Sequence, residues 1–321
     1  MQLHLPALAR IAEVEVAALA DADAERLNAA GTKWGVDHRY ADYRALLSDP
    51  SVNAVLITVP TPFHCAAFLA AVELGKHTYI EKPLAMNLEE ADRMLAAAAQ
   101  FAGCTVVGFN LRSHRLVQKA RELIRAGALG PIVSVRTVLV GGLQERPAWQ
   151  CRRAEGGGAF YELGIHHFDL WRFLLDTEVA HVEAQSLSDG SDDARVAVTA
   201  RLVNGALACS VFALHGAASH EIEVIGESAS LRFSLYRADS LEIRPAGRLR
   251  QFTRWLQQLP GAAKAARRGG DYVDSYRTHW LRFLESMRGG EPPATLQDGR
   301  EAVRIAVAAI ESSHDTFKEV P

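Results

Sequence analysis

The chain has 321 residues and a nearly balanced charge, with 35 Lys and Arg against 38 Asp and Glu and a net charge of −3. Hydrophobic residues make up 49% and aromatic residues 7%, which is typical of a soluble globular protein. At about 150 residues per domain, this length predicts two domains. The mixed charge disfavours nucleic-acid binding, and no apolar run reaches the roughly 20 residues that a membrane helix needs.

The cysteines exclude two further kinds of site. Cys65, Cys104, Cys151 and Cys209 lie far apart and form no Cys-x-x-Cys pair, so neither a zinc site nor a disulfide framework is expected. The first residues lack the basic and then apolar layout of a signal peptide. We therefore expect a protein of the reducing cytoplasm that binds neither a membrane nor a nucleic acid.

The first third of the chain is expected to alternate strands with helices. The run at residues 54–59 is continuously apolar and is followed by prolines, which indicates a strand buried on both faces of a parallel sheet. The other strands are expected at 14–20, 77–80 and 105–109, and the helices at 23–30, 40–47, 64–74 and 88–99. This order is typical of a doubly wound parallel sheet.

The remainder is expected to form a mostly antiparallel sheet with helices on one face, because strand-like runs follow one another directly. Asn204-Gly205 between two of these runs is a strong hairpin signal. The strands are expected at 132–140, 182–186, 195–202, 206–214, 221–225 and 230–235, and the helices at 117–126, 160–175, 272–287 and 299–312. Residues 248–270 are basic and have no readable pattern. We therefore divide the chain into residues 1–109 and 110–321.

An acidic residue, Asp21, follows the first expected strand. In dinucleotide-binding proteins an acidic side chain at this place binds the ribose hydroxyls and repels a 2′-phosphate. An aspartate after a strand also commonly serves as a turn or helix cap, and this alternative stays open. The fingerprint G-x-G-x-x-G that should precede the acidic residue is absent, because residues 1–20 contain no glycine.

Two further segments follow strands that should end at one edge of the sheet, where ligands bind in open α/β proteins. Thr58, Pro60 and His64 lie in the first segment, although its prolines are also explained by a strand end and a helix start. Glu81 and Lys82 lie in the second segment. A lysine there can stabilise a developing oxyanion, or the pair can be solvated side chains of a turn.

Residues 156–169 combine three glycines with acidic and imidazole side chains. On a helix Glu162, His166 and Asp169 would share one face, which suits general acid–base catalysis. The alternative is a structural stripe in which the histidine pairs with the aspartate. A metal site is disfavoured, because the spacing H-E-x-x-H is absent.

In this order the segments resemble the Gfo/Idh/MocA oxidoreductases, the superfamily of glucose–fructose oxidoreductase and inositol dehydrogenase. The similar features are Thr-x-Pro-x-x-x-His at 58–64, Gly-Lys-His and Glu-Lys-Pro within 75–83, and Gly-Gly-Gly through His-His-x-Asp at 156–169. The resemblance implies a Rossmann dinucleotide-binding domain at residues 1–109 and an α+β domain for substrate and oligomer contacts at 110–321. It further implies hydride transfer between NAD or NADP and a sugar, inositol or related polyol, in a homodimer or homotetramer.

The resemblance also implies roles for single residues. Lys82 would lie beside the nicotinamide and the reacting carbon, His166 would exchange the hydroxyl proton, and Glu162 and Asp169 would support the site. Glu162 stands where many members have aspartate, and Asp21 favours NAD over NADP. The other implied cofactor contacts are Thr58, Pro60, His64 and Glu81, and the implied substrate contacts are Asn110, Arg112, Trp149 and His167. Arg152, Arg153 and the basic residues at 267–268 are either further substrate contacts or surface charge.

The chain departs from the family pattern at its start. Met1 aligns near the end of the family's glycine-rich loop, and residues 5–10 would form the remainder of the first helix. The first strand, the middle one of the sheet, and the pyrophosphate-binding loop are therefore expected to be missing. Three interpretations follow: a shortened chain of an ordinary dehydrogenase, a binding or regulatory protein without redox activity, or an enzyme that cleaves glycosides with the help of NAD.

Overall fold

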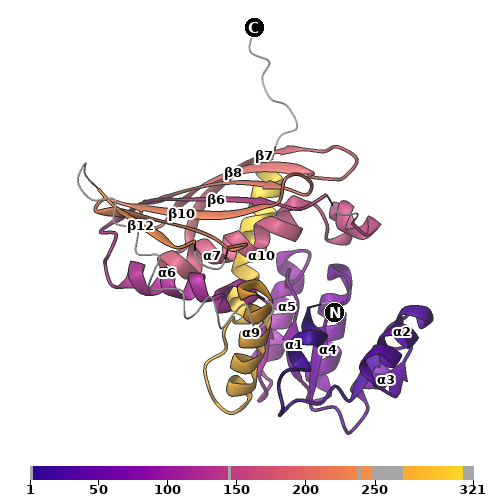
Figure 1. Cartoon of the computed structure of the whole chain (residues 1–321). Coiled ribbons are helices and arrows are strands. Elements are labelled where there is room, and N and C mark those ends of the chain that lie inside the picture. The colour runs from indigo at the N-terminus through magenta and orange to yellow at the C-terminus, as the bar shows by residue number, and fades with distance from the viewer. Residues whose placement is uncertain (1–2, 144–145, 238–239, 247–269, 314–321) are drawn as a thin grey trace. The chain divides into compact units, whose positions relative to one another are not determined.

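The computed structural model describes residues 3–143, 146–237, 240–246 and 270–313 (Figure 1). Its internal contacts divide the chain into two compact units. The first comprises Met1–Asn110 and Tyr276–Arg300, and the second comprises Leu111–Ser275 and Glu301–Pro321. Of the basic stretch at 248–270, all but Gly270 lies outside the described residues.

All strand pairings of the first unit are parallel within the described residues, which confirms the expected doubly wound type of sheet. The sheet is in two pieces, with β1 paired to β2 and with β4 between β3 and β5. The strands are β1 (Ala18–Ala20), β2 (His38–Tyr40), β3 (Ala54–Ile57), β4 (His77–Ile80) and β5 (Thr105–Val107). No described strand joins the two pieces, as expected for a sheet without its middle strand.

Three helices of the first unit, α2, α3 and α5, begin at polar caps. Asp23 accepts a hydrogen bond from the Arg26 N–H at the start of α2, and Asn87 accepts one from the Glu90 N–H at the start of α5. The helices are α1 (His4–Leu8), α2 (Ala24–Trp34), α3 (Tyr43–Leu47), α4 (His64–Glu73) and α5 (Leu88–Ala99), with a 3₁₀ turn at Thr61–Phe63. The helix remainder that the sequence predicted for residues 5–10 forms as α1, which spans His4–Leu8.

Several expected boundaries in this unit were wrong, and the strands expected at 14–20 and 105–109 form only at Ala18–Ala20 and Thr105–Val107. The helix expected to stop at Gly31 continues to Trp34, and Gly35 ends it with a φ of 68°. Gly31 serves packing instead, because a Cβ there would lie 2.0 Å from the Arg39 Nε. The helix expected from residue 40 begins only at Tyr43, because residue 40 still belongs to strand β2.

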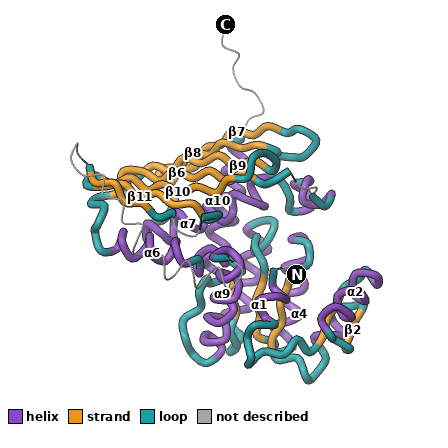
Figure 2. The backbone as a smooth tube through the Cα atoms, viewed as in Figure 1, coloured by secondary structure: helices purple, strands orange, loops and turns teal. Residues whose placement is uncertain are grey.

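The second unit contains a sheet of seven described strands in the order β12-β11-β10-β6-β9-β8-β7 (Figure 2). All neighbours are antiparallel except β6 and β9, which run parallel. The strands are β6 (Ile132–Val140), β7 (Val179–Leu187), β8 (Arg195–Leu202), β9 (Leu207–Ala213), β10 (Ser219–Gly226), β11 (Ala229–Ser234) and β12 (Glu242–Pro245). The mostly antiparallel sheet is therefore confirmed, with β12 as a strand that the sequence did not predict.

Helices cover one face of this sheet (Figure 1). They are α6 (Arg115–Arg125), α7 (Ile165–Leu175) and the later part of α10 (Leu296–Ser312), whereas α9 (Asp271–Met287) has most of its residues in the first unit. Exposed and buried residues alternate along these strands, most clearly in β8, where every second residue is buried. Apolar residues that remain exposed on the strands include Val138, Leu207 and Val211.

Candidate active site

Polar side chains gather where the strands of the first unit end. Thr58 follows β3 and Glu81 follows β4, and the two strands are in register, with Ile57 opposite Ile80. The Glu81 N–H donates to the Ile57 carbonyl over 3.0 Å, so the ladder continues past the strand ends. The carboxyl edge of a parallel sheet is the usual ligand-binding edge of α/β proteins. The sequence prediction that Thr58 and Glu81 lie at one edge therefore agrees with the register.

Asp21 follows β1 and is bound by an arginine that the sequence analysis did not identify. The Arg26 Nε and Nη2 donate to the two Asp21 carboxylate oxygens over 2.7 and 2.9 Å, and the Asp23 N–H adds a third bond of 2.9 Å. The hydrogen bonds from Arg26 are the main reason that the Asp21 pKa lies below its ordinary value. The Asp21 carboxylate is thus charged at neutral pH, beside a guanidinium that is largely exposed.

His64 connects the two strand ends. Its Nδ1 lies 2.8 Å from the Pro83 carbonyl and its Nε2 lies 2.9 Å from the Val59 carbonyl. Burial lowers the pKa of the ring, so a neutral His64 donates to one of these carbonyls. His64 is almost fully buried. Its observed contacts therefore fix the segments around Pro60 and Lys82 relative to each other.

A chain of hydrogen bonds holds Glu81. The Trp280 Nε1–H donates to the His4 Nδ1 over 3.1 Å, which leaves the His4 Nε2–H to donate to the Glu81 Oε1 over 2.8 Å. The other carboxylate oxygen accepts the Lys82 backbone N–H over 3.2 Å. Glycine is required at 108, because a Cβ there would lie 2.6 Å from the Glu81 Oε1. The half-buried Lys82 therefore extends from a fixed backbone.

In the second unit the glycine-rich segment leads into a π-helix at Phe160–Gly164 and then into α7. Gly157 is required because a Cβ there would lie 2.4 Å from the Gln150 carbonyl carbon. Glu162 lies within the π-helix and His166 lies in the first turn of α7. The expected regular α-helix from residue 160 was therefore wrong in its first turn. Single π-turns within helices occur frequently at functional sites.

Asp169 and Arg112 form a buried ion pair. The Arg112 Nε and Nη2 donate to the two Asp169 oxygens over 2.8 and 2.5 Å. The side chains are only 8% and 1% exposed, and the Arg112 guanidinium lies 4.9 Å from the centre of the Phe173 ring. The pair ties α7 to the 3₁₀ turn at Asn110–Ser113. These contacts suit positioning roles, whereas the sequence analysis had predicted that Arg112 contacts substrate.

Three buried histidines, His114, His167 and His220, lie near one another in the second unit. His220 on β10 has its Nε2 3.0 Å from the Nε2 of His167, and neither side chain is more than 2% exposed. Burial lowers the pKa of His167 to about 3 and that of His114 to about 4. Burial, with His167, His166 and His114 nearby, holds the pKa of His220 well below its ordinary value. His167, predicted as a substrate contact, is therefore neutral and packed in the core.

These histidines make stability depend on pH. An unfolded histidine binds a proton near pH 6.5, whereas the folded groups do not until well below that value. The folded state is therefore most stable above pH 7 and loses stability as the pH falls from about 6.5 towards 4. We expect each buried histidine to cost about 1 kcal/mol between pH 7.5 and 5.5, measured by urea unfolding. H114N, which keeps an acceptor for the Leu116 N–H, should weaken this dependence, and a variant of the exposed His181, H181N, should leave it unchanged.

The other predicted residues occupy different surroundings. Asn110 is fully buried at the end of the first unit, and Trp149 is half-buried in the 3₁₀ turn at Ala148–Cys151. Arg153 binds the buried Asp193 through two hydrogen bonds, one of 2.6 Å from its Nε. Arg152 binds the exposed Glu155 over 2.9 Å. Both arginines are thus paired within their own unit, and residues 267–268 lie outside the described part of the chain.

The described residues lack two further features. No helix there is long and apolar enough to cross a membrane. No group of three or more His, Cys, Asp or Glu side chains within the same ranges is arranged to hold a metal ion.

The fold and the strand ends define a protein of the dinucleotide-binding α/β type joined to an α+β unit. Two family models match the chain: the oxidoreductase family with an NAD-binding Rossmann fold at residues 1–109, and the GFO/IDH/MocA C-terminal domain at residues 117–232. The chain belongs to the Gfo/Idh/MocA oxidoreductases. The resemblance stated from the sequence is therefore confirmed.

Individual relatives match this sequence over nearly its whole length. An uncharacterized oxidoreductase, YrbE, of Bacillus subtilis is 29% identical, and the match covers 97% of this chain and 90% of the relative. Myo-inositol 2-dehydrogenase of Thermotoga maritima is 28% identical, with coverages of 97% and 92%. The solved structure of levoglucosan dehydrogenase in complex with NADH and levoglucosan superposes with a TM-score of 0.82 at 22% identity, with coverages of 97% and 93%. At this level of identity, the similarity shows that the two proteins share a fold.

Proposed function

We propose that the protein is an NAD-dependent oxidoreductase that transfers a hydride between the nicotinamide and a hydroxyl or carbonyl of a sugar, inositol or related polyol. The observation that carries the proposal is the fixed Glu81-Lys82 segment at the carboxyl end of β4, next to Thr58 at the end of β3. Membership of an NAD-binding oxidoreductase family supports it. The names of the relatives, myo-inositol 2-dehydrogenase and levoglucosan dehydrogenase, support the substrate class.

The described residues fit two parts of the dinucleotide. Asp21 offers carboxylate oxygens for ribose hydroxyls at the end of β1. The strand ends at Thr58 and Glu81 lie where a nicotinamide would be bound in such a sheet. A phosphate cradle is the part that the described residues do not supply, because the first glycine of the chain is Gly31, within helix α2.

Separate roles follow for the charged and imidazole side chains. Lys82 donates a hydrogen bond to the substrate oxygen as charge develops there, and His166 takes the hydroxyl proton during oxidation. Glu162 supports His166, and Asp169 positions α7 through Arg112. Bound NAD supplies the hydride acceptor. Asn110 and Trp149 remain proposed substrate contacts, with Thr58, Pro60 and His64 beside the cofactor, whereas His167 packs in the core of the second unit.

The direct test is a rate measurement on the full chain. With NAD and myo-inositol or levoglucosan as probes, we expect NADH to accumulate, followed by its absorbance. K82M should lower kcat/KM by about 10²-fold or more, whereas a variant of the exposed Lys119, K119M, should match the parent. Turnover by K82M within a few-fold of the parent would contradict the role of Lys82. Absence of NADH with every polyol tried, together with no NAD binding by calorimetry, would overturn the proposed function.

The Asp21–Arg26 pair predicts the cofactor preference. Removing the carboxylate in D21A releases the exposed guanidinium, which then suits the 2′-phosphate of NADP. We expect the ratio of NADP to NAD affinity to rise about tenfold or more, since a charge-assisted hydrogen bond is gained. Fluorescence titrations with NADH and NADPH measure it. D23A, which removes a second carboxylate near Arg26, is the matched control, and an unchanged preference in D21A would contradict the pairing argument.

We also propose that the protein is a cytoplasmic homodimer or homotetramer whose contacts use the sheet face that the helices leave open, and that residues 1–109 and 110–321 act as the cofactor and substrate domains. Val211 on β9 and Val138 on β6 are exposed and opposite each other in the parallel ladder. V211E should therefore lower the molar mass measured by light scattering to that of a monomer. A variant of the exposed loop residue Leu143, L143E, is the control, and an unchanged mass in V211E would contradict this choice of face.

A further inference from the structure

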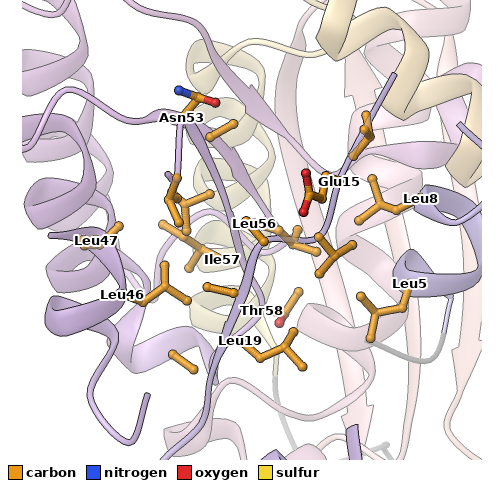
Figure 3. A pocket seen from close by; sticks show the side chains of 18 of the residues that line it. Leu5, Leu8, Glu15, Leu19, Leu46, Leu47, Asn53, Leu56, Ile57 and Thr58 are labelled. Atoms are coloured by element: carbon orange, nitrogen blue, oxygen red, sulfur yellow. The ribbon is translucent and has the colours of Figure 1, made fainter. Parts of the chain in front are cut away.

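Helix α1 places a histidine between strand β4 and helix α9 in the first unit. His4 is the first residue of α1 and is only 3% exposed. Leu5 and Leu8 of the same helix are buried and line the pocket beside β1 and β3 (Figure 3). The two leucines therefore anchor this short helix, while His4 contacts β4 and α9.

Three aromatic rings surround the imidazole of His4. Its ring centre lies 5.5 Å from that of Tyr79, 5.1 Å from that of Tyr276 and 6.0 Å from that of Trp280, and all three contacts are edge-on. Tyr79 and Trp280 also stack on each other at 4.4 Å. Close packing on several sides holds a side chain in one rotamer. The orientation of the His4 ring is thus set by its neighbours.

The hydrogen bond from Trp280 decides which nitrogen of His4 carries the proton. An indole nitrogen can only donate, so the His4 Nδ1, 3.1 Å from the Trp280 Nε1, must accept. An imidazolium carries a proton on both nitrogens and could not form this bond. His4 is therefore neutral, with its proton on Nε2.

A neutral His4 leaves the charge of Glu81 uncancelled. Glu81 accepts the His4 Nε2–H over 2.8 Å and the Lys82 backbone N–H over 3.2 Å, and such bonds favour the charged form of a carboxyl group. Burial raises the pKa of Tyr79 and lowers that of His64, and the Glu81 charge adds to the first shift and opposes the second. A fixed negative charge therefore acts on the residues around the ends of β3 and β4.

We propose that Trp280 and His4 are positioning residues that hold Glu81 as a fixed negative charge beside the nicotinamide, and that this charge favours binding of NAD⁺ over NADH. The inference rests on the proposed function, which places the nicotinamide at the ends of β3 and β4. The nicotinamide ring is a cation when oxidised and neutral when reduced, so a nearby carboxylate attracts only the oxidised form. The Trp280–His4–Glu81 chain thus biases the bound cofactor towards the form that accepts a hydride.

The first test measures the affinities of the full chain for NAD⁺ and NADH by calorimetry. E81Q keeps a polar side chain of similar size but removes the charge. We expect it to lower the NAD⁺ affinity relative to the NADH affinity by about tenfold, the order of effect of one charge near a protein surface. E89Q, which changes an exposed glutamate in the first turn of α5, is the matched control and should keep the parent ratio.

Two variants of His4 separate positioning from packing. In H4Q the amide oxygen can accept from Trp280 and the amide N–H can donate to Glu81, so we expect the affinity ratio to stay within roughly twofold of the parent. H4L fills similar space without either hydrogen bond and should lower the ratio by about threefold or more. Rescue by glutamine and loss with leucine is a pattern that a packing role alone would not produce.

Nitrogen NMR on protein with isotope-labelled histidine reads the tautomer without any cofactor. The His4 signals are identified by their loss in H4Q, and we expect a bare Nδ1 and a protonated Nε2 in the parent. W280F keeps an aromatic ring but removes the N–H donor, so Nδ1 should gain a proton at least in part and the affinity ratio should fall. W34F, which changes the tryptophan at the end of α2, is the control and should leave the His4 signals unchanged.

Three results would overturn parts of the proposal. A protonated Nδ1 in the parent would contradict the roles of Trp280 and His4. An unchanged affinity ratio in E81Q, with both cofactors bound, would contradict the role of Glu81 while the proposed function stands. Absence of binding by NAD⁺ and NADH alike would overturn the proposed function and the role of Glu81 with it, whereas the NMR spectrum would still decide the tautomer of His4.

Discussion

Replacing His166 by asparagine is expected to lower kcat/KM for polyol oxidation by about 10²–10⁴-fold, the usual contribution of a general acid–base group. Asparagine is similar in size but does not titrate, so the proton acceptor is lost while the first turn of α7 keeps a polar side chain. NADH affinity should stay within roughly twofold, because the proposed role concerns the substrate proton. Initial rates with NAD and myo-inositol over a range of pH measure the effect.

The pH profile distinguishes this role from a structural one. A general base makes kcat/KM rise with pH, and H166N should lack the rise that the parent shows. A variant of the exposed histidine on β7, H181N, is the matched control and should keep both rate and profile. An H166N enzyme that turns over within a few-fold of the parent, with the same profile, would contradict the assignment.

The strands and helices of this protein were predictable where the sequence pattern is long. The continuous apolar run at 54–59 contains β3, and residues 88–99 form α5 with the expected bounds. Short elements were not predictable. β2 has only three residues, His38–Tyr40, none of them buried, and it is a strand because it pairs with β1. Tertiary pairing decides such an element, whereas local composition does not.

The candidate site was also predictable only in part. Residues that follow strands, such as Asp21, Thr58 and Glu81, were identifiable because the topology places them at a ligand-binding edge. Their partners were not. His4 contacts Glu81 across 77 positions and Trp280 contacts His4 across 276 positions, and no local spacing encodes such contacts. Arg26 lies only five positions from Asp21, and an acidic–basic pair flanking a helix start could have indicated it.

The absence of the middle strand was expected from the glycine content and from alignment to the family pattern. In the structure the described strands of this unit form two separate sheets. Instead of closing up, β1 and β3 remain on opposite sides of an apolar pocket. The pocket is lined by apolar side chains of α1, α3 and α9, together with the acidic Glu13 and Glu15. This pocket could not be predicted from the sequence, because it depends on which strands pair.

Removing the carboxylate of Asp169 is expected to have the largest effect on stability. D169A should lower the free energy of unfolding by about 3–5 kcal/mol, because it leaves the Arg112 guanidinium buried without its bidentate acceptor. Urea unfolding at pH 7 measures the change. The matched control is E155A, which breaks the exposed Arg152–Glu155 pair and should cost at most about 1 kcal/mol. A cost of D169A no larger than that of E155A would contradict the argument.

The double variant R112M/D169L separates the net value of the ion pair from the cost of breaking it. Because replacing a buried ion pair by apolar side chains is often neutral or stabilising, we expect the double variant to recover most of the stability that D169A loses. It should nevertheless lower turnover, since the pair joins α7, which carries His166, to the turn at Asn110–Ser113. A stable double variant with full activity would show that the pair has no positioning role. A stable variant with reduced kcat, unchanged KM and the parent pH profile would indicate that Asp169 and Arg112 act by orienting α7.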